Sequence, residues 1–168
     1  MTYLTVALNS SHKKEEFECG KELLDNYIKF QAKQDVKRKL AACFILASED
    51  NSIQGYYTLS NAGIPREILP DQIKGKLPKS YNSLPATLLG RLAVAKAFAG
   101  QGIGQLLLMD ALKRSYDASL ANVASMAVIV DPIDDSASNF YSKYGFVLLP
   151  DSGKMFLVMQ TIGPLFKK

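Results

Sequence analysis

Blocks of apolar and polar residues alternate along the chain, and their spacing predicts a mixture of strands and helices. The run YLTVALN, residues 3–9, predicts a first strand that ends at an Asn-Ser-Ser turn. Residues 21–40 place Leu23, Leu24, Tyr27 and Ile28 at helical spacing, which predicts an amphipathic helix. Residues 41–62 hold two apolar runs around the turn residues 48–52, the pattern of a β-hairpin.

The middle of the chain changes character at a proline-rich segment, residues 65–85, where we expect a long connection with one short helix. Beyond it, ATLLGRLAV (residues 86–94) predicts a buried strand. Residues 103–120 predict a helix with Ile103, Leu107 and Ala111 on one face, and residues 123–131 predict a further strand. Strand, glycine turn, helix and strand together predict a β-α-β unit with a right-handed crossover.

The C-terminal part predicts a short helix followed by two strands. Asp134, Asp135 and Ser136 can cap the helix, and Gly145 can end it. Strands are expected at FVLL, residues 146–149, and KMFLVMQ, residues 154–160. The 168 residues suffice for one hydrophobic core, so we expect a single α/β domain over residues 1–168, with a central mixed, mostly antiparallel sheet flanked by helices.

Composition narrows the classes of protein. A hydrophobic fraction of 48% and a charged fraction of 21% are typical of a globular chain, and no apolar run reaches the ~18 residues of a membrane span. We therefore expect a cytoplasmic protein without a membrane partner. Cys19 and Cys43 are predicted to be buried free thiols, and His12, among polar residues, is predicted to titrate in solvent. We expect no metal site.

The net charge of +4 favours a polyanionic or phosphorylated partner. Lys29, Lys33 and Lys37 recur at i, i+4 and i+8 on the predicted first helix, which aligns them along one face. Such a stripe can follow a phosphate backbone, although a solvated helix face is the alternative. Arg91, in the strand GRLAV, is a further candidate for the same partner.

Three glycines at alternate positions, Gly100, Gly102 and Gly104, precede the helix at residue 103 onward. A dinucleotide fingerprint does not fit, because Gln105 stands where its third glycine belongs, and no Gly-Lys-Ser or Gly-Lys-Thr completes a Walker loop. Glycine amides at a helix N-terminus can nevertheless converge on a diphosphate. A tight structural turn is the alternative that spacing alone leaves open.

The wider segment LAVAKAFAGQGIGQLLL resembles the acetyl-CoA loop of the GNAT acetyltransferases, and NFYSKYGFV resembles the family's Phe-Tyr-x-x-x-Gly-Phe segment. The resemblance implies the GNAT fold, acetyl-CoA as co-substrate, and Gly102 and Gly104 as the required glycine pair. The family's usual Gln or Arg falls on Ala99, so one side-chain contact to the cofactor is lost. The residues that the resemblance assigns to the cofactor are Leu92, Ala93, Val94, Ala99, Gly100, Gln101, Gly102, Ile103, Gly104, Gln105 and Asn139.

Tyr141 matches the position of the family's general acid, which protonates the departing coenzyme A thiolate. A core aromatic packed with Phe140 and Phe146 is the alternative, and Tyr144 is the competing candidate for the acid. No general base stands out. A lysine with a pKa of ~10.4 is neutral in about one molecule in 2,500 at pH 7, whereas an α-amine of pKa ~7.7–8.0 is neutral in about a tenth of them. This favours an α-amine as acceptor, with water as the alternative base.

The segments LLDNYIKFQAKQD, GYYTLSNA and GRLAV are similar to the GNAT toxins of bacterial toxin–antitoxin modules. That resemblance implies acetylation of aminoacyl-tRNA at its α-amino group, a block of translation, a small DNA-binding antitoxin as partner, and a homodimer. Lys29, Lys33, Lys37 and Arg91 then hold the tRNA. These toxins usually have Leu-Ala-Val-Asp at the end of this strand. The last position is Ala95 here, so a role of that aspartate is in doubt in this chain. A small-molecule amine or a protein N-terminus as acceptor, and a non-catalytic acetyl-CoA sensor, remain alternatives.

Overall fold

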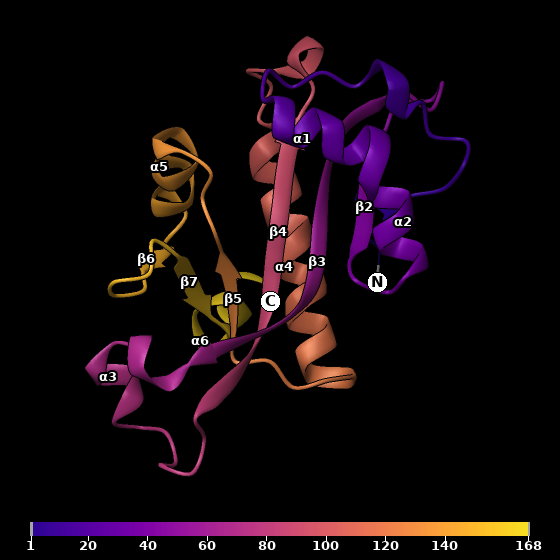
Figure 1. The fold of residues 1–168 in the computed structure, drawn as a ribbon. Coiled ribbons are helices and arrows are strands. Elements are labelled where there is room, and N and C mark those ends of the chain that lie inside the picture. The colour runs from indigo at the N-terminus through magenta and orange to yellow at the C-terminus, as the bar shows by residue number, and fades with distance from the viewer. Residues whose placement is uncertain (1, 168) are drawn as a thin grey trace. The chain divides into compact units, whose positions relative to one another are not determined.

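Seven strands form one mixed sheet in the order β1-β2-β3-β4-β5-β7-β6 in the computed structural model, which describes residues 2–167 (Figure 1). Neighbours in this order are antiparallel at β1/β2, β2/β3, β5/β7 and β7/β6, and parallel at β4/β5. The predicted mixed, mostly antiparallel sheet is thus confirmed. The strands are β1 (Val6–Ala7), β2 (Ala42–Ala47), β3 (Ile53–Pro65), β4 (Ser83–Val94), β5 (Ala127–Val130), β6 (Val147–Leu148) and β7 (Met155–Val158).

Helices of very different length accompany the sheet. The longest is α4 (Ile103–Ala121), and α5 (Asp135–Lys143) follows β5. The shorter α-helices are α1 (Glu22–Asn26), α2 (Ala32–Lys37), α3 (Asp71–Lys74) and α6 (Met159–Ile162). The π-helix η2 (Tyr27–Gln31) and the 3-10 turns η1 (Lys14–Glu16), η3 (Arg66–Ile68), η4 (Lys96–Phe98) and η5 (Gly163–Leu165) complete the regular structure.

The chain divides into two units that are described separately. The first unit runs to Ser60 and includes Leu89–Arg114, and the second unit consists of Asn61–Leu88 and the chain from Ser115. β3, β4 and α4 are each divided between them. The expectation of one domain over residues 1–168 stays a prediction.

The core of the first unit lies between the segment α1–η2–α2 and strands β2 and β3. Cys43 and Ile45 alternate with more exposed residues along β2, as the period of two along a strand requires. The hairpin is confirmed: Ile45 pairs with Tyr56, and the turn closes where the Ser48 N–H donates to the Ser52 carbonyl at 2.9 Å. The buried side chains of this core are Phe17, Leu24, Tyr27, Ile28, Ala32, Cys43, Ile45, Ile53, Tyr56, Ala93 and Ala95.

The predicted first helix is present, but it is not one regular α-helix. Five residues, Tyr27–Gln31, adopt π-helical geometry between α1 and α2. Both Tyr27 and Ile28 are buried within it. A π turn contains more residues per turn than an α-helix, so spacing by fours no longer fixes how Lys29 and Lys33 are directed relative to each other. Amphipathic periodicity cannot reveal such an insertion, because the apolar positions still recur.

The second unit has its own core, built from β3 and β4 residues, β5, β7 and the connection before β4. β4 and β5 pair in parallel at Thr87 and Val128, as the predicted β-α-β unit requires. The last predicted strand is shorter than expected, since β7 ends at Val158 and Met159 begins α6. The buried core residues are Ile64, Leu69, Leu84, Ala86, Ala127, Ile129, Leu149 and Phe156.

Arg66 organises the proline-rich connection. Its guanidinium donates to four backbone carbonyls, those of Lys74, Leu77, Pro78 and Tyr81, at 2.7 to 3.3 Å. The expected short helix is α3, and η3 precedes it. The prolines of this segment prevent regular sheet hydrogen bonding, and the Arg66 guanidinium satisfies its backbone carbonyls instead. The predicted length of the first strand is wrong, because β1 spans Val6–Ala7, paired with Ile45 and Phe44, and not residues 3–9.

Candidate functional site

A side-chain-free turn precedes the longest helix. After β4 ends at Val94, the chain makes the turn η4 and reaches Gly100 and Gly102, whose φ angles are +78° and +77°. A Cβ built on either glycine meets no atom within 4 Å, so the space over the turn is open. Left-handed backbone, rather than crowding, is what requires glycine at these two positions. Gly104 lies in the first turn of α4.

The N-terminus of α4 faces this turn with free donors. The Leu106 N–H donates to the Gly102 carbonyl at 3.2 Å, and the amides before Leu106 have no carbonyl one turn back within the helix. The positive end of the helix dipole adds to the attraction for an anion. Ala99, Gly100, Gln101 and Gly102 are exposed. The turn can therefore hold a phosphate or diphosphate against main-chain amides.

The end of β4 is held in place by backbone hydrogen bonds. The Ala95 N–H donates to the Gln54 carbonyl at 2.8 Å, and the Lys96 N–H donates to the Glu18 carbonyl at 2.8 Å. Ala93 is buried, while Leu92 and Val94 are half-buried. Gly55 on β3 is close enough that a Cβ there would lie 2.8 Å from the Ala93 carbonyl oxygen. The strand end is thus rigid before the chain enters the glycine turn.

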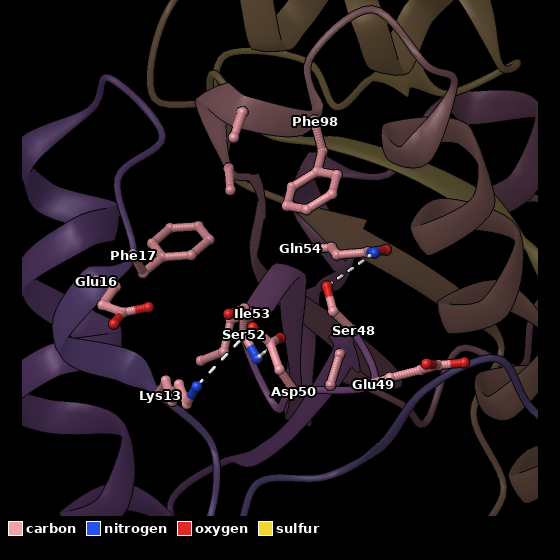
Figure 2. A pocket seen from close by; sticks show the side chains of 13 residues that line it. Lys13, Glu16, Phe17, Ser48, Glu49, Asp50, Ser52, Ile53, Gln54 and Phe98 are labelled. Atoms are coloured by element: carbon pink, nitrogen blue, oxygen red, sulfur yellow. Dashed lines mark hydrogen bonds and ion pairs between the residues drawn. The ribbon is translucent and has the colours of Figure 1, made fainter.

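A cavity of about 770 Å³ in the same unit is lined in part by Ala95, Ala97 and Phe98, which precede the glycine turn in the chain. Figure 2 shows the rings of Phe17 and Phe98 reaching into it from two different segments. Glu16, Glu49 and Asp50 outnumber the single cation that lines it, Lys13, which approaches Asp50 at 3.9 Å. This balance of charge is unsuited to a phosphate. No local sequence pattern predicts this cavity, because its wall comes from segments far apart in the chain.

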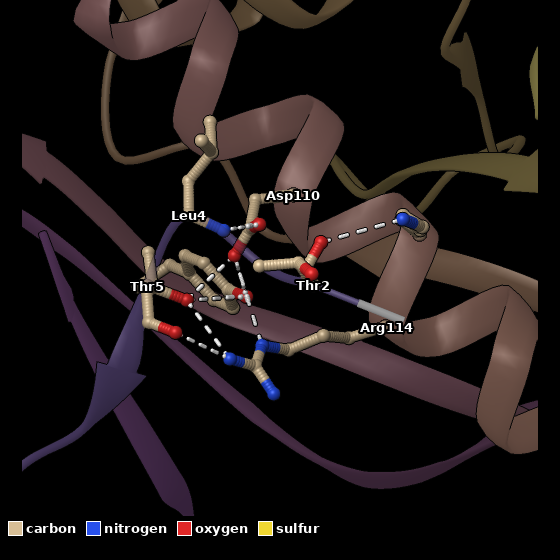
Figure 3. A network of polar contacts seen from close by, with 7 residues as sticks. Thr2, Leu4, Thr5, Asp110 and Arg114 are labelled. Atoms are coloured by element: carbon tan, nitrogen blue, oxygen red, sulfur yellow. Dashed lines mark hydrogen bonds and ion pairs between the residues drawn. The ribbon is translucent and has the colours of Figure 1, made fainter.

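A buried carboxylate anchors α4 to the start of the chain (Figure 3). Asp110 accepts hydrogen bonds from the Leu4 N–H at 2.7 Å, the Thr5 hydroxyl at 2.5 Å and the Tyr57 hydroxyl at 2.8 Å. The Arg114 Nε lies 3.7 Å from the same carboxylate, and its guanidinium donates to the Thr5 carbonyl at 2.7 Å. Asp110 was not among the predicted site residues. Its signal in the sequence is a charge inside the apolar run LLLMDAL.

Tyr141 lies on α5 in the second unit. The Asp134 side chain caps this helix by accepting from the Ala137 N–H at 2.8 Å, and Gly145, with φ of +95°, follows its end. The Tyr141 ring is 7% exposed and packs against Phe140 and Phe146, each with ring centroids 5.3 Å away. It is therefore packed in the core, as the alternative interpretation expected.

The Tyr141 phenol nevertheless keeps its hydrogen-bonding capacity. Burial raises its pKa well above the ordinary tyrosine value, so the hydroxyl keeps its proton through the neutral range. Within residues 2–167 no group accepts or donates a hydrogen bond at this hydroxyl. Tyr144, the competing candidate, is half-buried and stacks edge-on against Phe140 at 5.1 Å. Asn139, on the same helix, is exposed.

Arg91 lies over a stack of aromatic rings in the first unit. Its guanidinium carbon is 3.5 Å from the ring centroid of Tyr27, which stacks on Tyr56 at 6.3 Å. The Tyr27 hydroxyl donates to Asp35 at 2.9 Å, and burial together with this bond raises the pKa of Tyr27. In the part of the chain that the structure describes, Arg91 has no ion pair. A half-buried cation of this kind can receive an anionic group of a partner.

The predicted lysine stripe is partly accessible. Lys33 and Lys37 are exposed, whereas Lys29, inside η2, is half-buried. Lys33 lines a second cavity in this unit, of about 650 Å³, together with the loop that contains His12. The structure thus brings Lys33 to a cavity. The π turn removes the simple alignment on which the stripe was predicted.

His12 corrects one expectation. It is 6% exposed rather than solvated, because the loop folds back so that the Asn9 N–H donates to His12 Nδ1 at 3.1 Å. Cys43 is buried and Cys19 half-buried, both as free thiols, and burial raises their pKa values to about 12 and about 11. Residues 2–167 contain no group of three or more His, Cys, Asp or Glu side chains arranged to hold a metal ion. The helices described there include none long and apolar enough to cross a bilayer.

The chain is similar to known acetyltransferases in sequence and in fold. The model of the acetyltransferase (GNAT) domain family matches residues 40–148. A tRNA-acetylating toxin of Mycobacterium tuberculosis strain ATCC 25618 / H37Rv is 28% identical over 134 residues, which are 80% of this chain and 78% of that protein. The crystal structure of a tyrosine-to-phenylalanine mutant of KacT is similar with a TM-score of 0.87, 31% identity and coverage of 93% of both chains. AtaT complexed with acetyl-methionyl-tRNA is similar with a TM-score of 0.87, 27% identity and coverage of 97% of this chain and 98% of AtaT.

Proposed function

Because this chain belongs to the GNAT acetyltransferase family, we propose that it transfers the acetyl group of acetyl-CoA to the α-amino group of an aminoacyl-tRNA and thereby blocks translation. The observation that carries the proposal is similarity over nearly the whole chain to AtaT in complex with an acetylated aminoacyl-tRNA. The name of the mycobacterial relative agrees with it. We propose the cytoplasm as the place of action, since charged tRNA is found there.

The glycine turn fits the pyrophosphate of coenzyme A. It offers main-chain amides at the N-terminus of a long helix, a favourable dipole, and open space above Gly100 and Gly102. Ala99 contributes no polar side chain, so the amides carry the binding. A main-chain amide at Leu92–Val94 is proposed to donate to the thioester carbonyl. The backbone hydrogen bonds that hold the end of β4 keep this N–H in position before the substrate binds.

The reaction needs an oxyanion stabilised and a thiolate protonated. The amine nitrogen attacks the thioester carbon, and a C–N bond forms while negative charge develops on the carbonyl oxygen. When the tetrahedral intermediate collapses, the C–S bond breaks and the nitrogen loses a proton. We assign to Tyr141 the proton that the sulfur gains. Its burial supports this role, because the raised pKa keeps the hydroxyl protonated until the thiolate appears.

The acceptor amine requires little activation. An α-amine with a pKa of ~7.7–8.0 is already neutral in about a tenth of the molecules at pH 7, so water suffices to take its proton. Arg91, Lys29, Lys33 and Lys37 are proposed to hold the tRNA. The absence of an ion pair at Arg91 within residues 2–167 supports its part, because no carboxylate of the described chain neutralises its charge.

A small DNA-binding antitoxin is the proposed protein partner, and a homodimer the proposed assembly. Both come from the resemblance to toxin–antitoxin modules. Co-expression with a candidate DNA-binding antitoxin, followed by measurement of the mass of the complex, tests the two together. A purified chain that stays monomeric at every concentration would contradict the homodimer.

The test of the activity is an acceptor competition. Purified protein is mixed with acetyl-CoA and, in parallel, with charged tRNAs, the same tRNAs after deacylation, a polyamine, and a peptide with a free N-terminus. We expect release of coenzyme A with charged tRNA alone, and the acetyl group on the amino acid. Release with the polyamine or the peptide, but not with charged tRNA, would replace the proposal by the small-amine or N-terminal alternative.

A further inference from the structure

The cavity of about 650 Å³ in the first unit is lined by two segments. One is the stretch of residues 8–15, which follows β1 and runs into η1, and the other is α2, through Lys33 and Val36. This cavity is distinct from the acidic cavity of Figure 2, because the two share Lys13 alone among their lining residues. Its wall combines cations with hydrogen-bond donors, a combination that suits an oxyanion.

His12 is the buried polar group of this wall. Its Nδ1 accepts the Asn9 N–H at 3.1 Å, so this nitrogen carries no proton, and burial lowers the pKa of the ring. The hydrogen of the neutral imidazole therefore lies on Nε2, an assignment that follows from the hydrogen bond. Among residues 2–167, Nε2 has no hydrogen-bond partner. His12, a residue that is 6% exposed, thus presents an unused donor in the wall of a cavity.

The loop that carries His12 is fixed by its own backbone. The Ser11 N–H donates to the Asn9 side chain at 2.9 Å, and the Lys14 N–H donates to the His12 carbonyl at 3.0 Å. The Lys13 N–H donates to the Asn51 carbonyl at 3.0 Å, which ties the loop to the β2–β3 hairpin. The donor at Nε2 is therefore positioned before any ligand arrives.

The charges of the wall leave an excess of cation. Lys13 is engaged by Asp50 at 3.9 Å, while Lys14 and Lys33 have no ion pair within the described chain. Glu15 is the one carboxylate among the cavity residues. The ammonium groups of Lys14 and Lys33 and the carboxylate of Glu15 together carry a net charge of +1, which complements the single negative charge of a phosphodiester.

We propose that this cavity binds one backbone phosphodiester of the RNA acceptor, with His12 Nε2–H, Lys14 and Lys33 as donors. The inference rests on the proposed function, since that function supplies the RNA. Lys33 links the cavity to the helix segment of Lys29 and Lys37, so an RNA strand along that segment continues into the cavity. Inorganic phosphate shares the chemistry but lacks the strand, and it should bind far more weakly.

The imidazole of His12 reports on the cavity directly, because this is the single histidine of the chain. Its NMR signals are followed while full-length protein is titrated with deacylated tRNA, and separately with inorganic phosphate. We expect a saturable shift with tRNA at the concentration where tRNA binds, and a shift with phosphate at far higher concentration. A histidine signal that stays constant while tRNA binds would overturn the inference.

Substitutions distinguish the contribution of the His12 donor to tRNA binding from that of the lysine charges. His12→Phe removes a neutral donor, so tRNA affinity should fall by about 10-fold while the salt slope of binding stays the same. Lys33→Gln should lower the magnitude of that slope by about 0.7 to 0.9, because one phosphate contact is lost. His12→Gln restores an N–H and should recover part of the affinity. Lys167→Gln, at an exposed lysine outside the cavity, is the matched control and should leave the slope as it is.

The outcomes distinguish this inference from the proposed function. If charged tRNA is acetylated and His12→Phe binds tRNA as the parent does, the phosphodiester site in the cavity is overturned and the proposed activity stands. If the histidine signal moves with tRNA but no charged tRNA is acetylated, the phosphodiester contact is supported and the activity fails. A signal that moves with phosphate and not with tRNA overturns RNA as the occupant.

Discussion

Thr5 donates its hydroxyl to the Asp110 carboxylate at 2.5 Å across 105 positions of sequence (Figure 3). The same carboxylate receives the Leu4 N–H and the Tyr57 hydroxyl, so the start of the chain, β3 and α4 converge on one side chain. Because α4 also supplies the amides of the glycine turn, this network holds the helix whose N-terminus is proposed to bind the cofactor. Asp110 is a positioning residue.

Asp110→Ala should strongly destabilise the protein. The substitution leaves the half-buried Arg114 guanidinium without its carboxylate and three donors without their acceptor, and breaking a buried pair in this way costs about 3 to 5 kcal/mol. Urea unfolding measures the loss, with Glu49→Gln, an exposed carboxylate, as control. Asp110→Asn, which keeps the shape, should lose less. An unfolding midpoint equal to that of the control would show that the network contributes nothing.

Gly102→Ala should weaken both the fold and the binding of acetyl-CoA. A left-handed φ of +77° costs a non-glycine residue roughly 1 to 2 kcal/mol, and relaxing the backbone misdirects the amides. Gly153 provides the matched control, because its φ is +71° and the space around it is equally open. Gly153→Ala should lose similar stability and keep its affinity for acetyl-CoA. Equal affinity in both variants, measured by calorimetry, would argue against the turn as the cofactor cradle.

Much of the fold follows from the sequence, since the hairpin and the buried strand before the glycine turn depend on local apolar spacing. The departures have local causes too. The π turn at Tyr27–Gln31 inserts residues without disturbing apolar recurrence, and regular strand geometry in β1 is confined to Val6–Ala7. Periodicity shows which residues face a core but not how many residues complete a turn.

The site was less predictable than the fold. The glycine turn and Tyr141 have motifs, so the sequence singled them out, although the left-handed φ of Gly100 was not foreseen. His12, Asp110 and Arg66 act through contacts between residues far apart or through backbone groups. No spacing rule reports such partners. An isolated charge in an apolar run, as at Asp110, is the one signal that could have raised the question.

Tyr141→Phe should reduce acetyl transfer by about 10²- to 10⁴-fold while leaving acetyl-CoA binding intact, because it removes the proposed proton donor and keeps the ring. The ring contacts with Phe140 and Phe146 do not involve the hydroxyl, so stability should hardly change. Single-turnover rates and cofactor affinity are measured side by side. Tyr144→Phe is the matched control, at the residue that directly follows the same helix. If Tyr144→Phe loses the activity and Tyr141→Phe keeps it, the acid has been assigned to the wrong tyrosine.

Stability should fall in alkali because several tyrosines are buried. Burial is the main cause that raises the pKa values of Tyr27, Tyr56, Tyr57 and Tyr141 above the ordinary value near ~10. Above that value the unfolded chain releases phenolic protons that the folded chain retains, so the free energy of unfolding decreases as the pH rises. The contribution is fully present below pH ~10. Tyrosinate absorbance and circular dichroism should therefore change together for these residues. Full tyrosine ionisation in a chain that stays folded would contradict their burial.

Arg91→Lys should raise the KM for charged tRNA by about 2- to 30-fold with little change in the salt slope. The charge is kept, but the planar group that lies 3.5 Å over Tyr27 is lost, and such a contact contributes roughly 0.5 to 2 kcal/mol. Lysine also cannot present two parallel donors to a phosphate. Arg38→Lys, at an exposed arginine after α2, is the matched control and should keep the parent KM. Unfolding by urea is measured for both variants. If Arg91→Lys loses stability but keeps the parent KM, Arg91 packs the tyrosine stack and does not bind the tRNA.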